Sequence, residues 1–126
     1  MQAMVDRIVT EWGRLEVAVN NAGIEISRPF LEATDEEWER VIRVNLYGPY
    51  LVSQCAARAM VAKGDGGRLL NSSSVHEDFP FPGYTSYCAS KGGRRWISPV
   101  PEGWMRWTDS TLLHWLLNAR LDLRGP

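Results

Sequence analysis

A tyrosine and a lysine in the second half of the chain have the types and spacing for proton transfer. Tyr87 and Lys91 stand at positions i and i+4, so on a helix their side chains share one face, with Cβ atoms about 5–6 Å apart. An ammonium that close favours the phenolate, which suits a tyrosine to acid–base chemistry near neutral pH. Taken alone, the pair has a plain alternative, because such neighbours are usually two solvated side chains.

Other polar residues precede this pair where apolar segments end. The turn at residues 20–23 reads Asn-Asn-Ala-Gly after a short apolar run, Asn45 lies inside a long amphipathic segment, and Ser74 follows a second apolar run. The turn could simply end a strand, and the asparagine could simply permit a helix bend. In open α/β sheets, however, ligands bind outside the carboxyl ends of the strands, so we expect a functional site there.

The segments that must position these residues alternate between helical and strand patterns. Apolar residues recur at helical spacing over residues 2–12, and a capping box of Thr34 and Glu37 opens a second helix that should run to about residue 63. Short apolar runs near residues 16–20 and 68–72 are typical of buried strands. The sequence predicts an α/β fold in which two adjacent parallel strands are joined by a right-handed crossover.

Two interruptions mark the predicted helices. Gly48 and Pro49 fall inside the long helix, where we expect a kink rather than a break. A Pro-rich loop, residues 79–83, then leads into the helix that carries Tyr87 and Lys91. A short apolar helix is also expected over residues 111–123.

Composition excludes several classes of protein. The 126 residues are 44% hydrophobic and 23% charged with a net charge of -1, which fits one globular domain and argues against a disordered chain or a basic nucleic-acid binder. No apolar run approaches the roughly 18 residues of a membrane span, and we expect a cytoplasmic protein. The two cysteines form no C-x-x-C or Cys/His cluster, which predicts reduced thiols and no metal site.

Four signals in fixed order, taken together, are similar to the short-chain dehydrogenase/reductase family. They are the Asn-Asn-Ala-Gly turn, the mid-helix Asn45, Ser74 placed thirteen residues before a tyrosine, and the Tyr-x-x-x-Lys pair itself. The stretches at residues 71–77 and 87–93 resemble the glucose 1-dehydrogenase branch most. The resemblance implies a Rossmann-like doubly wound parallel sheet, of which this chain holds the central part.

The resemblance also implies roles for the catalytic residues Asn45, Ser74, Tyr87 and Lys91. Tyr87 would exchange a proton with the substrate oxygen during hydride transfer, and Ser74 would hydrogen-bond that oxygen. Lys91 would favour the tyrosinate and hold the nicotinamide ribose, while Asn45 would hold a water that joins Lys91 to a proton relay.

Cofactor and partners follow from the same resemblance. Asn20, Ala22 and Gly23 would pass close to the adenosine half of NAD or NADP, and Tyr87 and Lys91 would contact its nicotinamide half. The substrate would be a small alcohol or carbonyl compound, such as a sugar, and the intact family member would be a homo-oligomer without nucleic-acid or membrane partners. His76 lies two residues after Ser74 and has either a loop role or a direct substrate contact.

The resemblance covers residues 1–93 and leaves 94–126 as a divergent tail. The 126 residues contain no glycine-rich G-x-x-x-G-x-G turn for the cofactor pyrophosphate, so NAD and NADP cannot be distinguished. Four of the six tryptophans lie in the tail, as expected if it is read in a shifted frame. We therefore expect a truncated oxidoreductase chain that is inactive alone; the alternative is a non-catalytic remnant that serves as an interaction fragment.

Overall fold

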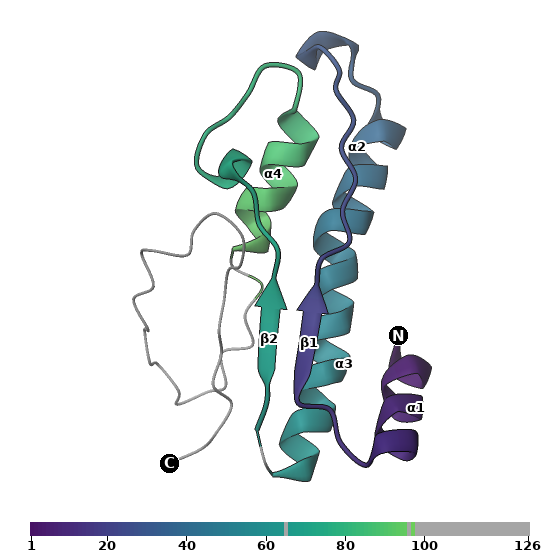
Figure 1. Cartoon of the computed structure of the whole chain (residues 1–126). Helices are drawn as coiled ribbons and strands as arrows, with labels where there is room; N and C mark the ends of the chain where they lie inside the picture. The colour runs from purple at the N-terminus through teal and green to yellow at the C-terminus, as the bar shows by residue number, and fades with distance from the viewer. Residues whose placement is uncertain (65, 96, 98–126) are drawn as a thin grey trace.

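Two short parallel strands lie at the centre of the structure, a computed structural model that describes residues 1–64, 66–95 and 97 (Figure 1). Strand β1 (Val17–Asn20) pairs with β2 (Arg68–Asn71) in the register Val17↔Arg68 to Asn20↔Asn71. The predicted α/β class and the parallel pairing are confirmed. The apolar helix expected over residues 111–123 lies outside the described residues.

The helices that precede, join and follow these strands have bounds close to those expected from the sequence. In chain order they are α1 (Gln2–Trp12), the 3-10 turn η1 (Phe30–Glu32), α2 (Asp35–Ile42), the π-helical turn η2 (Arg43–Tyr47), α3 (Gly48–Lys63), the 3-10 turn η3 (Val75–Glu77) and α4 (Thr85–Arg94). The segments α2, η2 and α3 form one continuous run, so the long helix predicted over residues 34–63 is present (Figure 1). The interruption predicted near Gly48 and Pro49 takes the form of a π-helical turn that ends just before them.

The core lies between α3 and one face of the two strands. Ala56 and Met60 of α3 pack on Leu69 of β2, and all three are almost completely buried. Ala18 of β1 packs against the same cluster. Because side chains alternate along a strand, the residues between these core positions point to the opposite face.

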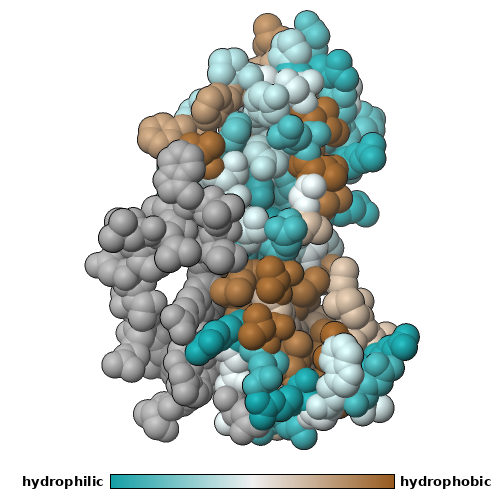
Figure 2. Space-filling model, viewed as in Figure 1, coloured by the Kyte–Doolittle hydropathy of each residue, from teal (hydrophilic) through white to brown (hydrophobic). Residues whose placement is uncertain are grey.

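That opposite face of the strands is open. Val17 and Val19 of β1 are 45% and 54% exposed, and Figure 2 shows hydrophobic surface over the strands where α3 does not cover them. Among the described residues, helices therefore cover one face of the two-stranded sheet and leave the other face exposed.

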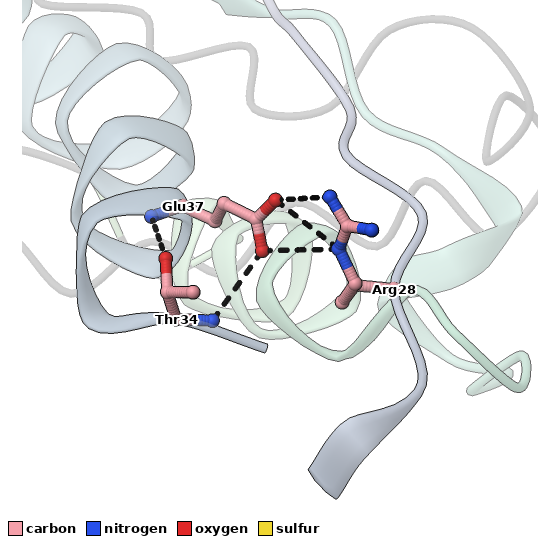
Figure 3. Close-up of polar contacts among 3 residues, drawn as sticks. All are labelled: Arg28, Thr34 and Glu37. Atoms are coloured by element: carbon pink, nitrogen blue, oxygen red, sulfur yellow. Dashed lines mark hydrogen bonds and ion pairs between the residues drawn. The ribbon is translucent and has the colours of Figure 1, made fainter. Parts of the chain in front are cut away.

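The loop after β1 is fixed to α2 by an ion pair (Figure 3). Glu37 completes the predicted capping box, since its backbone N–H donates to the Thr34 hydroxyl and its carboxylate accepts from the Thr34 backbone N–H. The same carboxylate accepts a 2.6 Å hydrogen bond from Arg28, and this contact lowers the pKa of Glu37. The backbone N–H of Arg28 in turn donates to the Gly83 carbonyl at 2.8 Å, so the loop after β1 is also fixed to the entry of α4.

A close approach between the loop before β2 and α3 generates the first prediction. A Cβ atom at Gly67 would lie 2.3 Å from Sδ of Met60, and Met60 is completely buried, so Gly67→Ala must displace a core side chain. We expect a loss of about 1–3 kcal/mol in the free energy of unfolding, the usual cost of overpacking, measured by urea denaturation.

Gly92→Ala is the matched control. Its added Cβ would meet nothing closer than 3.7 Å, and alanine is the better helix former, so this variant should be as stable as the parent chain or slightly more stable. Equal stability of the two alanine variants would contradict the close packing at Gly67.

Candidate active site

Buried amides join the carboxyl ends of the two strands. Nδ2 of Asn20 donates 2.8 Å hydrogen bonds to Oδ1 of Asn71 and to the hydroxyl of Ser53 on α3. The backbone N–H of Ser72 continues the pairing to the Asn20 carbonyl at 2.9 Å. Asn20, predicted to line the cofactor, therefore has its side-chain nitrogen committed to the protein interior, and its contact with a cofactor stays a prediction.

Asn45 lies in the π-helical turn and bonds to the chain leaving β1. Its Oδ1 accepts from the Ile24 backbone N–H at 2.8 Å, and its Nδ2 donates to the Ile24 carbonyl at 2.7 Å. Nδ2 also donates to the Ser90 hydroxyl on α4 at 3.0 Å. The side chain is completely buried, so this one amide connects the loop after β1, the long helical run and α4.

The backbone of Asn45 has a different environment from its side chain. Pro49 stands four residues later and has no N–H, so the Asn45 carbonyl lacks the partner that it would have in a regular α-helix. The side-chain amide is engaged with Ile24 and Ser90, and the contact of Asn45 with a water stays a prediction.

Tyr87 and Lys91 lie on α4, the helix that the sequence predicted for them. Lys91 is 4% exposed, and its Nζ donates to the Ser72 carbonyl at 3.1 Å and lies 5.4 Å from the centre of the Tyr87 ring. Gly23 is the next close neighbour, because a Cβ atom there would lie 3.9 Å from Nζ of Lys91 and 3.5 Å from Oδ1 of Asn45. The structure thus brings Gly23, Asn45 and Lys91 together where the strands end.

His76 contacts both Ser74 and Tyr87. Ser74 is the N-cap of η3, and its Oγ lies 3.1 Å from Nδ1 of His76. The imidazole ring is edge-on to the Tyr87 ring, with 5.2 Å between ring centres. His76 is therefore part of the site, through contacts with two of the predicted catalytic residues.

A buried arginine is the residue that sequence reasoning missed. Arg94 is 1% exposed, and its guanidinium donates to the backbone carbonyls of Asn20 and of Ala22, the latter at 3.4 Å. Its Nε has no hydrogen-bond partner among the described residues. Its position three residues after Lys91 indicates the same helix face, but an arginine there is usually read as a solvated side chain.

The two buried cations influence each other. Burial lowers the pKa of Lys91, the adjacent guanidinium of Arg94 lowers it further, and Glu77 partly opposes both effects. Burial also lowers the pKa of Arg94. Among the described residues neither group forms an ion pair with a carboxylate, and both donate to backbone carbonyls at the strand ends instead.

Within residues 1–64, 66–95 and 97, no three His, Cys, Asp or Glu side chains are grouped so as to hold a metal ion. Nor does any helix there combine the length and the apolar character needed to cross a membrane.

The depressed pKa of Lys91 predicts a pH-dependent stability. An unfolded lysine titrates near 10.4, so between the lower folded value and about pH 10.4 the unfolded chain binds more protons, and the free energy of unfolding must rise with pH across that interval. Urea denaturation in steps from neutral pH to about pH 10.4 should show this rise in the parent chain and a smaller one in Lys91→Met.

Lys63→Met is the control, because Lys63 is an exposed lysine at the end of α3. It should leave the rise unchanged, whereas Arg94→Met should reduce it by removing the neighbouring charge. An identical pH dependence in the parent chain and in Lys91→Met would contradict the assigned burial of the ammonium.

Comparisons with known proteins identify the family of this chain. The family model described as short chain dehydrogenase matches residues 1–98, which extends beyond the boundary at residue 93 expected from the sequence; that boundary stays a prediction. An Escherichia coli K12 protein, the uncharacterized oxidoreductase YohF, is 42% identical over 87 residues, which are 69% of this chain and 34% of the relative. This chain thus spans about a third of the length of that curated relative.

Solved structures show the same fold. A gluconate 5-dehydrogenase from Burkholderia cenocepacia J2315, in complex with NADP and tartrate, superposes with a TM-score of 0.71 at 35% identity, over 75% of this chain and 36% of that one. An acetoin dehydrogenase YohF from Salmonella typhimurium gives a TM-score of 0.70 at 34% identity, over 75% and 37% of the two chains. The partial parallel sheet of this chain is therefore of the Rossmann type, and the chain belongs to the short-chain dehydrogenase family of oxidoreductases.

Proposed function

We propose that this chain carries the proton-transfer part of an NAD(P)-dependent oxidoreductase site. In this site Tyr87 exchanges a proton with the oxygen of an alcohol or carbonyl substrate, and Ser74 donates a hydrogen bond to the same oxygen. The observation that carries the proposal is the placement of the Lys91 ammonium, buried at the strand ends and 5.4 Å from the Tyr87 ring. This arrangement places a positive charge beside the residue proposed to exchange the proton.

The residues at the strand ends fit the nicotinamide half of a dinucleotide. Gly23 presents bare backbone beside Lys91 and Asn45, and a side chain at that position would narrow the space above the strand ends. Lys91 makes one hydrogen bond, to Ser72, among the described residues, and an ammonium has three N–H donors. Lys91 can therefore also hold the hydroxyls of the nicotinamide ribose. Asn20, Ala22 and Gly23 are proposed to pass close to the adenosine half of the cofactor.

The nicotinamide, when bound, supplies or accepts the hydride. The protein's own residues orient the substrate and exchange the proton. Ser74 orients the substrate oxygen, Tyr87 gives or takes its proton, and Lys91 holds a positive charge beside Tyr87. Asn45 would extend the relay by holding a water at its main-chain carbonyl, which has no N–H partner four residues on because residue 49 is a proline. Its side chain meanwhile fixes the loop that lies below the cofactor.

The substrate class proposed is a small alcohol or carbonyl compound, including polyhydroxylated ones. The relatives named as a gluconate 5-dehydrogenase and an acetoin dehydrogenase support this range. NAD and NADP are both proposed, because the choice between them depends on groups at the adenosine ribose, and the resemblance assigns that role to none of the described residues. Self-association of the whole protein is proposed on the family resemblance.

Turnover by the 126-residue chain alone is not expected. General acid–base catalysis contributes only about 10²–10⁴-fold, and the cofactor must also be bound through its pyrophosphate, for which these residues supply no glycine-rich turn. The alternative, a non-catalytic piece that associates through its apolar surface, is favoured by the exposed Val17 and Val19. The catalytic and the non-catalytic proposal predict different activities when this segment is placed within a longer chain of the family.

A chimaera tests the proposal. Residues 1–93 of this chain replace the matching segment of the Escherichia coli relative YohF, and consumption of reduced nicotinamide is followed by absorbance with acetoin and a panel of ketones and sugars. We expect turnover, and Tyr87→Phe should lower kcat by about 10²–10⁴-fold by removing the proton donor.

Tyr47→Phe is the matched control in the chimaera. Tyr47 is 53% exposed in η2, so loss of its hydroxyl should leave kcat unchanged. A folded chimaera that binds the nicotinamide cofactor without turnover, or whose activity survives Tyr87→Phe, would contradict the proposed function and favour the non-catalytic alternative.

A further inference from the structure

His76 lies within hydrogen-bond distance of Ser74, although the proposed function gives it no role. Its Nδ1 lies 3.1 Å from Oγ of Ser74, and its backbone N–H donates to the same Oγ at 3.3 Å. Two nitrogen atoms of His76 therefore lie within hydrogen-bond distance of the Ser74 hydroxyl, which is proposed to bind the substrate oxygen. The direction of the Ser74 hydroxyl proton depends on whether Nδ1 of His76 carries a proton.

Three aromatic rings hold the imidazole in place. Phe81 lies 4.5 Å away between ring centres, Tyr84 lies 5.5 Å away edge-on, and Tyr87 lies 5.2 Å away edge-on. We call Phe81, Tyr84 and Tyr87 the aromatic cage of His76. Because the cage packs against the ring on several sides, it limits rotation of the ring and keeps Nδ1 directed at Ser74.

The chemistry of the hydroxyl makes the tautomer decisive. A carbonyl oxygen can only accept a hydrogen bond, so Ser74 assists it only by donating its hydroxyl proton. If Nδ1 carries no proton, it accepts that same hydroxyl proton and competes with the substrate. If Nδ1 carries a proton, it donates to Oγ together with the His76 backbone N–H; both lone pairs of the hydroxyl are then filled, and its proton is free for the substrate.

We propose that His76 is a positioning residue that, in its Nδ1–H form, donates to Ser74 and directs the Ser74 hydroxyl proton toward the substrate oxygen. The proposal rests on the proposed function for the identity of that oxygen. The direction of the hydroxyl proton itself depends only on residues of this chain. The second nitrogen, Nε2, is then the unprotonated one in the neutral ring.

Long-range ¹H–¹⁵N NMR of the full chain labelled in histidine tests the tautomer directly, because the two ring nitrogens have different shifts when protonated. The chain has two histidines, and a His114→Gln variant identifies the signals of His76. We expect His76 as the Nδ1–H tautomer, in contrast to a free imidazole, which favours Nε2–H. Ser74→Ala should return His76 to the free preference, whereas Ser74→Thr keeps the hydroxyl and should keep the tautomer.

Two results overturn the proposal: an Nε2–H tautomer or a free-imidazole mixture in the parent chain, or a tautomer that Ser74→Ala leaves unchanged. The parent chain and Ser74→Thr decide the question even if Ser74→Ala does not fold.

Kinetics of the chimaera give an independent reading. His76→Phe keeps an aromatic ring in the cage but removes the donor, and it should lower kcat about tenfold, the equivalent of one hydrogen bond. His76→Asn restores an N–H near the position of Nδ1 and should recover most of the loss in kcat, which a purely structural role would not predict. Equal losses in both variants count against the proposal.

An inactive chimaera whose His76 still shows the Nδ1–H tautomer overturns the proposed function and supports the placement of the Ser74 proton.

Discussion

The buried amide of Asn45 is the interaction on which the arrangement of the site depends. It pairs with both the N–H and the carbonyl of Ile24, as a neighbouring strand would, and it reaches Ser90 on α4. Loss of the amide would leave two partly buried backbone groups of Ile24 without this partner, at up to about 1–3 kcal/mol for each. The π-helical turn places this side chain at the level where β1 ends. Through it, the position of Gly23 relative to Lys91 is set by three segments far apart in the sequence.

The second constraint is electrostatic. Lys91 and Arg94 are both buried, and both donate to backbone carbonyls at the strand ends rather than to carboxylates. Such an arrangement costs stability, because buried cations lose hydration that carbonyl oxygens restore only in part. The proposed chemistry makes use of the same feature, since a buried cation interacts strongly with a polar ligand. Stability and the proposed function are thus opposed at α4.

The sequence predicted the elements better than the connections between them. Helical periodicity gave the bounds of α1, and the capping box at Thr34 gave the start of α2, because both signals are local. The shared face of Tyr87 and Lys91 followed from their spacing alone. In contrast, the π-helical turn changes the register of a helix without a distinctive composition, and the partners of Arg94 lie more than seventy residues earlier in the chain. The role of Asn20 in the buried amide layer likewise depends on its register with Asn71, which only the strand pairing defines.

Amide hydrogen exchange at Ile24, followed by NMR in the parent chain and in Asn45→Ala, tests the central claim most directly. The Ile24 N–H lies in a loop outside regular secondary structure, and its described acceptor is Oδ1 of Asn45 at 2.8 Å. The amide of Ser72, which donates to the Asn20 carbonyl, is the internal reference. The account predicts that Ile24 exchanges slowly in the parent chain and much faster in Asn45→Ala, while Ser72 stays protected in both. Fast exchange of Ile24 in the parent chain, beside a protected Ser72, would contradict it.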